Sequence, residues 1–387
     1  MNWQEIIIDA AATDTGMRRS NNQDSHAIVR AKTIETWKKR GHVFMVADGM
    51  GAHAAGELAS KLACDNIPHN FAKLKIDSPA EGLTRAYREV AKIIHTKATA
   101  NKDFEGMGTT ASALVLLPAG ALIAHVGDSR VYRVRNGTIE QLTFDHSLVW
   151  ELFHRGHLSR EEAMRSVPKN VITRSLGPDP NIEVDIEGPY PVESGDVFLL
   201  CSDGLSGPVE DPEIGAFASV FHPEEACKYL LHLANLRGGQ DNITVMVVRT
   251  GPWEDPDDPS RSVTTNGVAA EKAGKGKGFS LTGLVNAFQR KPALEPVEES
   301  IYVSAPCPLD ATLFDRLGED LRRVHSTAVE QAWPVDWAEL TRSRREAEAC
   351  RAAGNHRLAL KHLGEAIVRL GVAGRLHRKE YGPIGAK

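Results

Sequence analysis

The spacing of apolar residues along the first 250 positions predicts several amphipathic helices. Between Gly56 and Leu74 the apolar residues recur with the helical period, and Pro68 is expected to break or kink that helix. Residues 79–97 carry a second stripe at spacings of three and four residues, which is the pattern of one buried helix face. Further helical segments are predicted over residues 148–165, about 212–220 and about 223–236.

Short apolar runs bounded by turn residues predict strands. The run Val43–Ala47 stops at Asp48-Gly49, and Asn136-Gly137 is a strong two-residue hairpin signal. The remaining predicted strands cover residues 111–117, 121–126, 129–135, 138–142, 184–188, 197–201 and 243–248. Strands followed by helices and then by strands again are typical of an α+β layered domain with antiparallel sheets.

A change of composition at Gly251 divides the chain into three expected regions. Residues 1–250 are predicted to form one compact domain, and residues 251–308 have the Pro-, Gly- and charge-rich composition of a flexible linker. Apolar spacing over residues 281–288 also fits one short amphipathic helix within that linker, although a weakly structured patch is the simpler interpretation. Residues 309–381 are helical by pattern and are predicted to form a small all-α module.

The C-terminal module admits more than one interpretation. Residues 347–370 resemble one tetratricopeptide unit, but a single unit cannot bury its own apolar face well. A module that docks a partner protein and a small helical bundle therefore fit equally well. If the module only recruits a substrate, we expect deletion of residues 252–387 to leave turnover of a small substrate unchanged.

Composition narrows the class of protein. The 387 residues are 42% hydrophobic and 25% charged, as in soluble globular proteins, and 46 Lys and Arg against 51 Asp and Glu give a net charge of −5. No overall basic field favours nucleic acid. The longest apolar stretch, residues 111–126, is too short and too interrupted to span a membrane.

Cysteine usage and the N-terminus bear on location. The five cysteines are far apart and form no C-x-x-C pair, so neither a zinc site nor a disulfide framework is indicated. Their odd number suits a reducing cytosol. Residues 1–5 have neither the basic nor the apolar region of a signal peptide. We therefore expect a cytoplasmic protein.

Five aspartates at or near strand ends are the strongest chemical signal in the chain. They are Asp24, Asp48, Asp128, Asp203 and Asp241. Carboxylates gathered at the ends of several strands suggest a site for a hard cation such as Mg²⁺ or Mn²⁺, which prefers oxygen ligands. Each Asp taken alone is more simply a turn residue or half of a surface ion pair.

An arginine close to the first of these aspartates points toward phosphate chemistry. Arg19 offers a planar fork of donors that suits phosphate oxygens, and Asp24 follows it closely. Two glycines after Asp48 let the backbone approach an ion, so the carbonyl of Gly49 is a further candidate ligand. The simpler interpretation of Arg19 and Asp24 alone is a surface turn with an ion pair.

Taken together, these motifs resemble a known family over about residues 5–250. The motifs, in chain order, are Asp14-x-Gly16-x-x-Arg19, Asn22-Gln23-Asp24, Asp48-Gly49-Met50-Gly51, Gly108-Thr109-Thr110, Gly127-Asp128-Ser129-Arg130, Ser202-Asp203-Gly204-Leu205 and Asp241-Asn242-Ile243-Thr244. The set is similar to that of the metal-dependent protein phosphatases, the type 2C serine/threonine phosphatases, in their bacterial form. Each motif is weak by itself, but the complete set in the family's order is highly specific.

The resemblance implies a fold and a metal centre. The fold would be two antiparallel β-sheets in a central sandwich flanked by helix pairs, with two Mn²⁺ or Mg²⁺ ions in a cleft at one end. Asp48 would bridge both ions, and the Gly49 carbonyl would complete the shell of the first. Asp203 and Asp241 would bind the second ion, and Asp24 would act through metal-bound water.

The resemblance also implies a reaction. Arg19 would hold the substrate phosphate while a hydroxide that bridges the two ions attacks phosphorus in line. The substrates would be phosphoserine and phosphothreonine in proteins. The enzyme would oppose bacterial serine/threonine kinases, and its partners would be phosphorylated proteins that include such kinases. No protein nucleophile is then required, and positioning and charge neutralisation would supply the catalysis.

Three departures from the family pattern affect details. Met50 stands where several eukaryotic members have a proposed general-acid His, so metal-bound water is the expected proton donor and His53 a weaker candidate. Gly207 replaces an Asp that helps to hold a third metal, so Asp128 predicts a third site that is weak or absent. Residues 145–177 resemble the bacterial flap beside the cleft, in which Val167 replaces a frequent His; an ordinary helical insertion is the alternative.

Other functional classes fit the sequence less well. A serine hydrolase built on Ser129 lacks the Gly-x-Ser-x-Gly elbow, and no Cys is followed six residues later by Arg, as in cysteine phosphatases. A catalytically dead sensor that binds phosphoproteins remains an alternative. The retained Arg19, Asp48, Asp203 and Asp241 argue against it, because a pseudoenzyme typically loses metal ligands.

Overall fold

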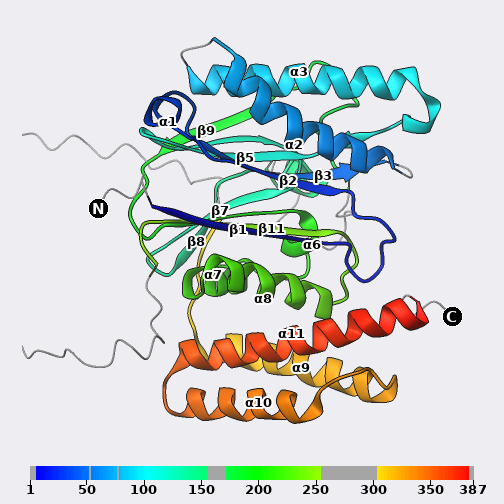
Figure 1. Ribbon diagram of the computed structural model, residues 1–387, viewed down its shortest axis with the longest axis vertical. Helices are drawn as coiled ribbons and strands as arrows, with labels where there is room; N and C mark the ends of the chain where they lie inside the picture. The colour runs from blue at the N-terminus through cyan, green and yellow to red at the C-terminus, as the bar shows by residue number, and fades with distance from the viewer. Residues whose placement is uncertain (1–5, 52–53, 76–77, 155–170, 254–302, 383–387) are drawn as a thin grey trace, which may run out of the picture. The chain divides into compact units, whose positions relative to one another are not determined.

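The computed structural model describes residues 6–51, 54–75, 78–154, 171–253 and 303–382. Figure 1 shows two β-sheets packed face to face, with α2 and α3 over one sheet and α7 and α8 over the other. Each pair of neighbouring strands is antiparallel, so the predicted α+β sandwich is confirmed. No helix within the described ranges is long and apolar enough to cross a membrane.

The first sheet has the strand order β1-β11-β10-β7-β8-β12. Its strands are β1 (Ile7–Asp14), β7 (Arg130–Arg135), β8 (Thr138–Gln141), β10 (Val197–Cys201), β11 (Ile243–Thr250) and β12 (Ser304–Pro306). β10 and β11 are buried at every position, as expected of central strands covered on both faces.

The second sheet has the order β2-β3-β5-β6-β9, and β4 pairs with the end of β3. Its strands are β2 (Asp24–Val29), β3 (His42–Met50), β4 (Gly108–Thr109), β5 (Ala111–Leu117), β6 (Gly120–Val126) and β9 (Asp185–Tyr190). β3 is buried from Val43 to Ala47 and becomes partly exposed at Asp48, so this strand carries its carboxylate out of the core at its end.

Helices cover the outer faces of both sheets. The covering helices are α2 (Ala55–Lys73) and α3 (Pro79–Ala100) on one sheet and α7 (Asp211–Val220) and α8 (Pro223–Leu236) on the other. The shorter elements are α1 (Ile34–Arg40), the 3-10 turn η2 (Lys102–Phe104), α4 (Leu148–His154) and α6 (Asp203–Ser206). α2 continues through Pro68, which differs from the expected break. Ile67 and Phe71 are buried on either side of it, and this burial offsets the unfavourable proline, which costs a helix about 3 kcal/mol.

Side chains from alternating strand positions fill the space between the sheets. Phe44 and Val46 of β3 meet Leu200 of β10 and Met246 of β11 there, and all four are fully buried. The intervening positions of the same strands face the outer helices in two further clusters. The two-residue period of each strand thus points alternate side chains toward the opposite sheet and toward the outer helices, and both faces of each sheet are covered.

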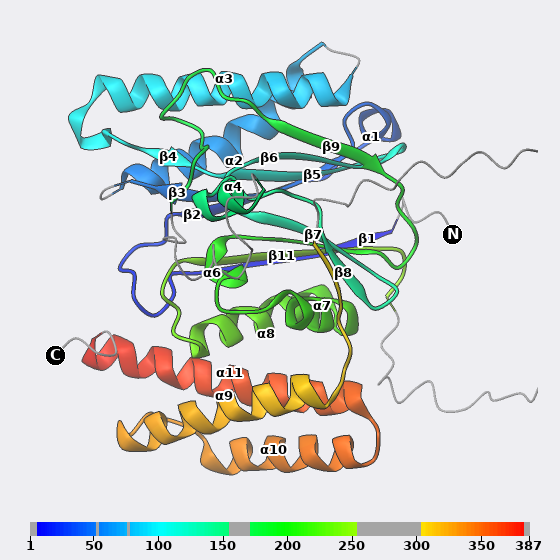
Figure 2. The same cartoon turned by 180° about the vertical axis from the view of Figure 1, so that it is seen from behind.

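Of the three C-terminal helices, α9 (Ala311–Glu330), α10 (Trp337–Ala352) and α11 (His356–Tyr381), α11 packs against α8, and the other two pack against α11. Figure 2 shows α11 lying between α8 and the other two. α11 approaches α8 through glycines: a Cβ on Gly364 would lie 2.9 Å from the Tyr229 ring. Residues up to 253 and from 302 onward form one compact unit.

A buried ion cluster also joins these helices to the sandwich. Arg237 at the end of α8 donates to Glu213 of α7 at 2.6 and 2.8 Å and to Asp320 of α9 at 2.8 Å. The exposed fractions of these three side chains are 10%, 3% and 12%. The described C-terminal helices are therefore held against the sandwich by both apolar and charged contacts.

Some predicted segments differ from the structure, and others lie outside the described residues. β12 lies near the end of the span expected to be linker and pairs with β8. Residues 254–302 of that span, including the possible helix over residues 281–288, lie outside the described residues. The predicted helix over residues 148–165 is described only as far as residue 154.

Candidate metal and phosphate site

The predicted aspartates come from both sheets and meet at one end of the sandwich. Asp24 begins β2 and lies directly opposite Asp48 in the β2–β3 register. Asp203 begins α6, with Ser202 between it and β10, and Asp241 lies one residue away from the start of β11, with Asn242 between them. Burial raises the pKa of both Asp24 and Asp48, and the charge of Asp203 adds to this effect, as expected where carboxylates of the two sheets lie close together.

Asp24 is held by hydroxyl groups of the opposite sheet. Ser202 Oγ donates to Asp24 Oδ2 at 2.8 Å, and Thr244 Oγ1 donates to the same oxygen at 2.7 Å. Burial nevertheless raises the pKa of Asp24 to about 7, and nearby negative charges add to that effect. Its second oxygen, Oδ1, is buried and has no hydrogen-bond partner among the described residues.

The Gly-Thr-Thr motif fixes the backbone of Asp48. Its N–H donates to Thr110 Oγ1 at 2.8 Å, and its carbonyl accepts from Thr110 N and Thr109 Oγ1, both at 2.9 Å. These hydrogen bonds fix the backbone of Asp48, and the fixed backbone limits the positions that its carboxylate can take. Burial, followed by the charge of Asp24, raises its pKa well above the ordinary value.

Gly49 is required by the close approach of two other chain segments. A Cβ at this position would lie 2.1 Å from the carbonyl oxygen of Gly56 and 2.5 Å from that of Gln23. Both distances are impossible for a carbon atom, so any side chain would push α2 or the β2 entry away from β3. The structure thus explains the glycine beside Asp48 on steric grounds, independently of a role for its carbonyl.

Asp203 and Asp128 are a second pair of crowded carboxylates. Burial and the charge of Asp241 raise the pKa of Asp203 to about 6. Burial and the charge of Asp203 raise the pKa of Asp128 to about 8. Oδ1 of each is buried without a hydrogen-bond partner in the described part of the chain. Asp128, Asp203 and Gly207 line one cavity of about 160 Å³.

Arg19 lies beside these carboxylates on an exposed loop. Its Nη2 donates to Asp241 Oδ2 at 2.7 Å, and its side chain is 53% exposed. The hydrogen bond and charge of Asp241 raise the pKa of Arg19, and the charges of Asp48 and Asp203 act in the same direction. A guanidinium that is always charged and accessible, and that lies next to a group of carboxylates, can bind an anion. The same anion can also contact a cation that the carboxylates hold.

Asn242 anchors the loop that carries Arg19, a role that the sequence analysis did not assign. Its Oδ1 accepts from Gln23 N at 2.8 Å, and its Nδ2 donates to the carbonyls of Thr15 and Asn21 at 3.0 and 2.9 Å. One side chain beside Asp241 thereby ties down both ends of the loop. The Asp-Asn dipeptide was visible in the sequence, but its loop contacts connect residues more than 200 positions apart.

The donor set fits hard divalent cations. Three buried carboxylate oxygens, on Asp24, Asp128 and Asp203, have no hydrogen-bond partner within the described residues. Such groups are costly to bury unless an ion or a proton satisfies them. Within the described ranges, no three His, Cys, Asp or Glu side chains form a sufficient metal shell by themselves. A bound ion would therefore take further oxygen ligands from water and from main-chain carbonyls.

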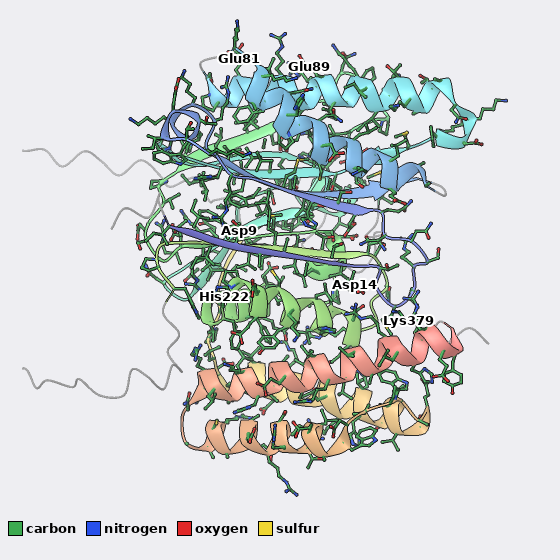
Figure 3. The ribbon with its side chains drawn as sticks, in the orientation of Figure 1. Asp9, Asp14, Glu81, Glu89, His222 and Lys379 are labelled. Atoms are coloured by element: carbon green, nitrogen blue, oxygen red, sulfur yellow. The ribbon has the colours of Figure 1, made fainter. Side chains whose placement is uncertain are left out.

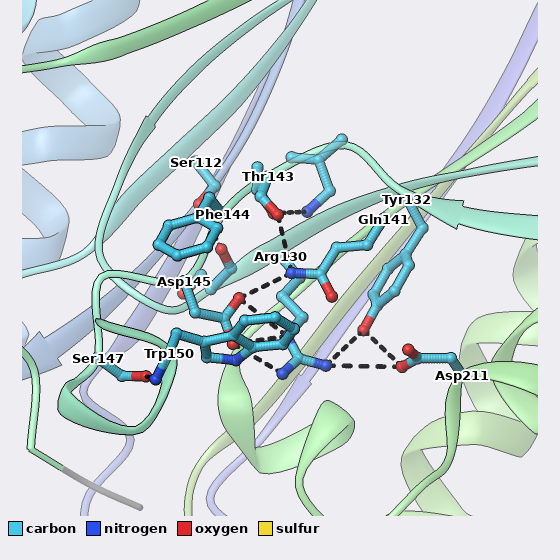
Figure 4. A network of polar contacts seen from close by, with 12 residues as sticks. Ser112, Arg130, Tyr132, Gln141, Thr143, Phe144, Asp145, Ser147, Trp150 and Asp211 are labelled. Atoms are coloured by element: carbon cyan, nitrogen blue, oxygen red, sulfur yellow. Dashed lines mark hydrogen bonds and ion pairs between the residues drawn. The ribbon is translucent and has the colours of Figure 1, made fainter. Parts of the chain in front are cut away.

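A buried network beside Asp128 fixes the start of the segment that resembles a flap (Figure 4). Arg130 donates through Nε and Nη2 to Asp145 at 2.7 to 3.0 Å, and its Nη1 donates to Tyr132 at 3.0 Å. Tyr132 in turn donates to Asp211 at 2.9 Å. Arg130, the arginine of the Gly-Asp-Ser-Arg motif, therefore stabilises the fold through these bonds and is not available to a substrate.

Some residues of the expected site are not described by the structure. They are His53, Val167 and the middle of the flap-like segment. Met50 lies opposite Gly108 in the β3–β4 pair.

Comparisons with known proteins agree with this geometry. A family profile described as "Protein phosphatase 2C" matches residues 17–236. The serine/threonine phosphatase stp of Listeria welshimeri is 38% identical over 241 residues, which cover 61% of this chain and 93% of that protein. The protein phosphatase PhpP of Streptococcus pneumoniae is 37% identical, over 61% of this chain and 94% of that protein.

Solved structures give the same result. The serine/threonine phosphatase of S. agalactiae superimposes with a TM-score of 0.58 at 34% identity, covering 63% of this chain and 100% of that one. The catalytic domain of the phosphatase PstP, in complex with two manganese ions, gives a TM-score of 0.54 at 33% identity, covering 64% and 99%. With the fold, the motifs and these matches in agreement, the chain belongs to the protein phosphatase 2C family, whose members are enzymes that hydrolyse phosphoproteins.

Proposed function

We propose that this chain is a serine/threonine protein phosphatase that uses two Mn²⁺ or Mg²⁺ ions held by Asp48, Asp203 and Asp241. The Gly49 carbonyl completes the shell of one ion, and Asp24 acts through water. The ions, when bound, lower the pKa of water and neutralise charge on the phosphoryl group, so that hydrolysis proceeds at neutral pH. A third ion at Asp128 is weak or absent, because Gly207 supplies no carboxylate.

The residues of the chain position the substrate and the ions. Arg19 binds two phosphate oxygens and orients the phosphoryl group, once the anion draws it from its ion pair with Asp241. Ser202 and Thr244 hold one oxygen of Asp24 and leave the other free to accept from water. The Thr110 hydroxyl and amide keep Asp48 in place, as needed for a carboxylate shared by two ions.

One observation carries this proposal. Buried carboxylates from both sheets crowd together beside an exposed arginine, and burial and mutual repulsion raise the pKa values of Asp24, Asp48 and Asp203. A fold does not retain such a costly arrangement for stability. Divalent cations would relieve the repulsion, and the arginine would bind the phosphate that they attract.

The natural substrates belong to the same proposal. We place the enzyme in the cytoplasm, acting on phosphorylated proteins that include serine/threonine kinases. The names of the relatives support the substrate class, since the matched proteins are serine/threonine phosphatases.

Hydrolysis of p-nitrophenyl phosphate by the full chain tests the proposal. We expect turnover with Mn²⁺, none after chelation, and none for Asp48→Asn with Mn²⁺. Asp65→Asn on the exposed face of α2 is the matched control and should behave like the wild type, because Asp65 is exposed and forms a surface ion pair with Lys61. Equal, metal-independent rates for wild type and Asp48→Asn would end the enzyme interpretation.

A further inference from the structure

We propose that α11 positions the phosphate-binding arginine: Arg378, assisted by Arg375, holds the loop of residues 14–20 that presents Arg19. This inference rests on the proposed role of Arg19 and adds the C-terminal helices to the working parts of the enzyme. Arg378 and Arg375 touch the loop and not the substrate, so both are positioning residues.

The contacts are direct. Arg378 donates through Nη1 to the carbonyl of Gly16 and through Nη2 to the carbonyl of Arg19 itself. Arg375, one turn earlier on α11, donates to the carboxylate of Asp14 at the end of β1. Figure 3 shows Asp14 and Lys379 close together where the end of α11 meets that loop, and both residues line the same cavity.

Other anchors of the loop come from the sandwich. Asn242 holds the carbonyls of Thr15 and Asn21 from the sandwich, and Met17 N donates to the carbonyl of Gly239 at 2.6 Å. The Arg19 side chain itself has Asp241 as its partner. The two contacts of Arg378 therefore complete a clamp, because the loop is held both by the sandwich and by α11.

The helix that supplies this clamp is itself firmly placed. A Cβ on Gly371 would lie 2.5 Å from Nδ1 of His232 in α8, and one on Gly374 would lie 2.7 Å from the Trp333 ring. Such contacts leave no gap into which α11 could shift without separating from its neighbours. The backbone at Arg378 is consequently well placed, and the two carbonyls of the loop hold its guanidinium, as a residue that orients a loop requires.

A second role for Arg378 must be separated from the first. A cation in the last turn of a helix also stabilises that helix through its macrodipole. Lysine at position 378 would keep the charge at the helix end but cannot donate to two separate carbonyls with a rigid fork. Arg378→Lys therefore distinguishes an effect on the helix from an effect on the loop.

Release of the loop should weaken phosphate binding more than it slows chemistry. If Arg19 occupies its binding position for only a fraction of the time, the apparent affinity for phosphate falls by that fraction. We expect Arg378→Ala to raise the KM for p-nitrophenyl phosphate with Mn²⁺ roughly tenfold, and inorganic phosphate to inhibit correspondingly less well. The kcat should stay within about twofold, since bound substrate restores the loop.

A double-mutant cycle tests the inference in the full chain. Arg378→Ala, Arg378→Lys and Arg19→Ala are compared singly, and the two alanine changes are combined. If Arg378 acts through Arg19, Arg378→Ala has no further effect on KM once Arg19 is absent. The matched control is Arg369→Ala, which removes an arginine of α11 that pairs with Glu339 of α10 and does not contact the loop; its KM should equal that of the wild type.

Hydrogen exchange gives a readout that does not depend on activity. The amides of residues 15–20 should exchange faster in both Arg378 variants than in the wild type and the Arg369 variant, while α8 stays equally protected. An unchanged KM in Arg378→Ala, additive effects in the cycle, or unchanged exchange of the loop would each overturn the inference. A wild-type chain without Mn²⁺-dependent turnover would instead overturn the proposed function, and the inference with it.

Discussion

Replacement of Asp203 by Asn should stabilise the metal-free protein while it destroys the metal site. Asp203 is largely buried, and burial together with the charge of Asp241 raises its pKa from 3.8 to about 6. The unfolded chain has no such crowding, so its Asp203 ionises near the ordinary pKa. At pH values above 6 the folded, metal-free protein therefore holds a carboxylate charge that its surroundings oppose.

The magnitude follows from linkage. Because its pKa is raised in the folded state, Asp203 contributes to the free energy of unfolding fully below pH 3.8. This contribution is lost as the pH rises through about 6. A shift of about two pKa units corresponds to roughly 3 kcal/mol of unfolding free energy at pH 8, and to about half of that at pH 5. Because Asn keeps the shape and removes the charge, Asp203→Asn should recover up to about 3 kcal/mol at pH 8.

Denaturant unfolding with chelator at pH 8 and pH 5, then with Mn²⁺ at pH 8, measures these differences. With Mn²⁺ at a thousand times its Kd the order should reverse, since such an ion stabilises the wild type by about 4.1 kcal/mol, which exceeds the roughly 3 kcal/mol gained by the variant. Asp196→Asn is the control, because this buried carboxylate accepts from Arg135 at 2.6 Å and should lose stability when neutralised. A metal-free Asp203→Asn protein less stable than wild type at pH 8 would refute the reasoning.

Three further predictions concern packing and reactivity. Gly49→Ala should lower the unfolding free energy by about 3 kcal/mol or more and abolish Mn²⁺ binding by calorimetry, because its Cβ would meet the Gly56 carbonyl at 2.1 Å. Asp320→Ala should cost roughly 2 to 3 kcal/mol in denaturant unfolding, since Arg237 loses one of two buried partners; a cost under 0.5 kcal/mol would count against the cluster. Iodoacetamide at pH 8 should leave turnover unchanged, because burial raises the pKa of Cys201 and of Cys227 to about 12; inactivation that tracks labelling of either thiol would contradict this.

Much of the sandwich could be predicted from local pattern. The hairpin at Asn136-Gly137 joins β7 and β8 as expected, because Asn136 takes the positive φ that such a turn needs. β1 and β2 were not predicted. β1 contains three consecutive alanines, and β2 buries only Asp24 of its six residues, so neither strand shows the apolar alternation by which strands are detected.

The residues of the candidate site could be proposed from the sequence, but the contacts that hold them in place could not. Asp24, Asp48 and Arg19 stood out because their motifs are local, and the structure brings them to the same end of the sandwich. The hydroxyls of Ser202 and Thr244 reach Asp24 only after the two sheets pack, across 178 and 220 residues of sequence. Contacts of that separation leave no periodicity in the chain.

The contacts of the C-terminal helices were even harder to predict from the sequence. Their helical pattern was clear, but nothing in it indicated that α11 would pack on α8 and reach the Arg19 loop. This packing also changes what a deletion should do. Removal of residues 303–387 would expose the apolar face of α8 and release Arg19, so we expect small-substrate turnover to suffer, unlike the result for a module that only recruits substrates.

Release of phosphate from a phosphothreonine peptide, followed as Mn²⁺ is added back to metal-free protein, tests the central claim most directly. We predict no turnover without metal, a rise that follows the binding of about two ions, and no turnover of Asp48→Asn at any Mn²⁺ concentration. Full turnover by the metal-free wild type, or equal rates for wild type and Asp48→Asn, would contradict the claim that these carboxylates hold the ions that hydrolyse the phosphoprotein.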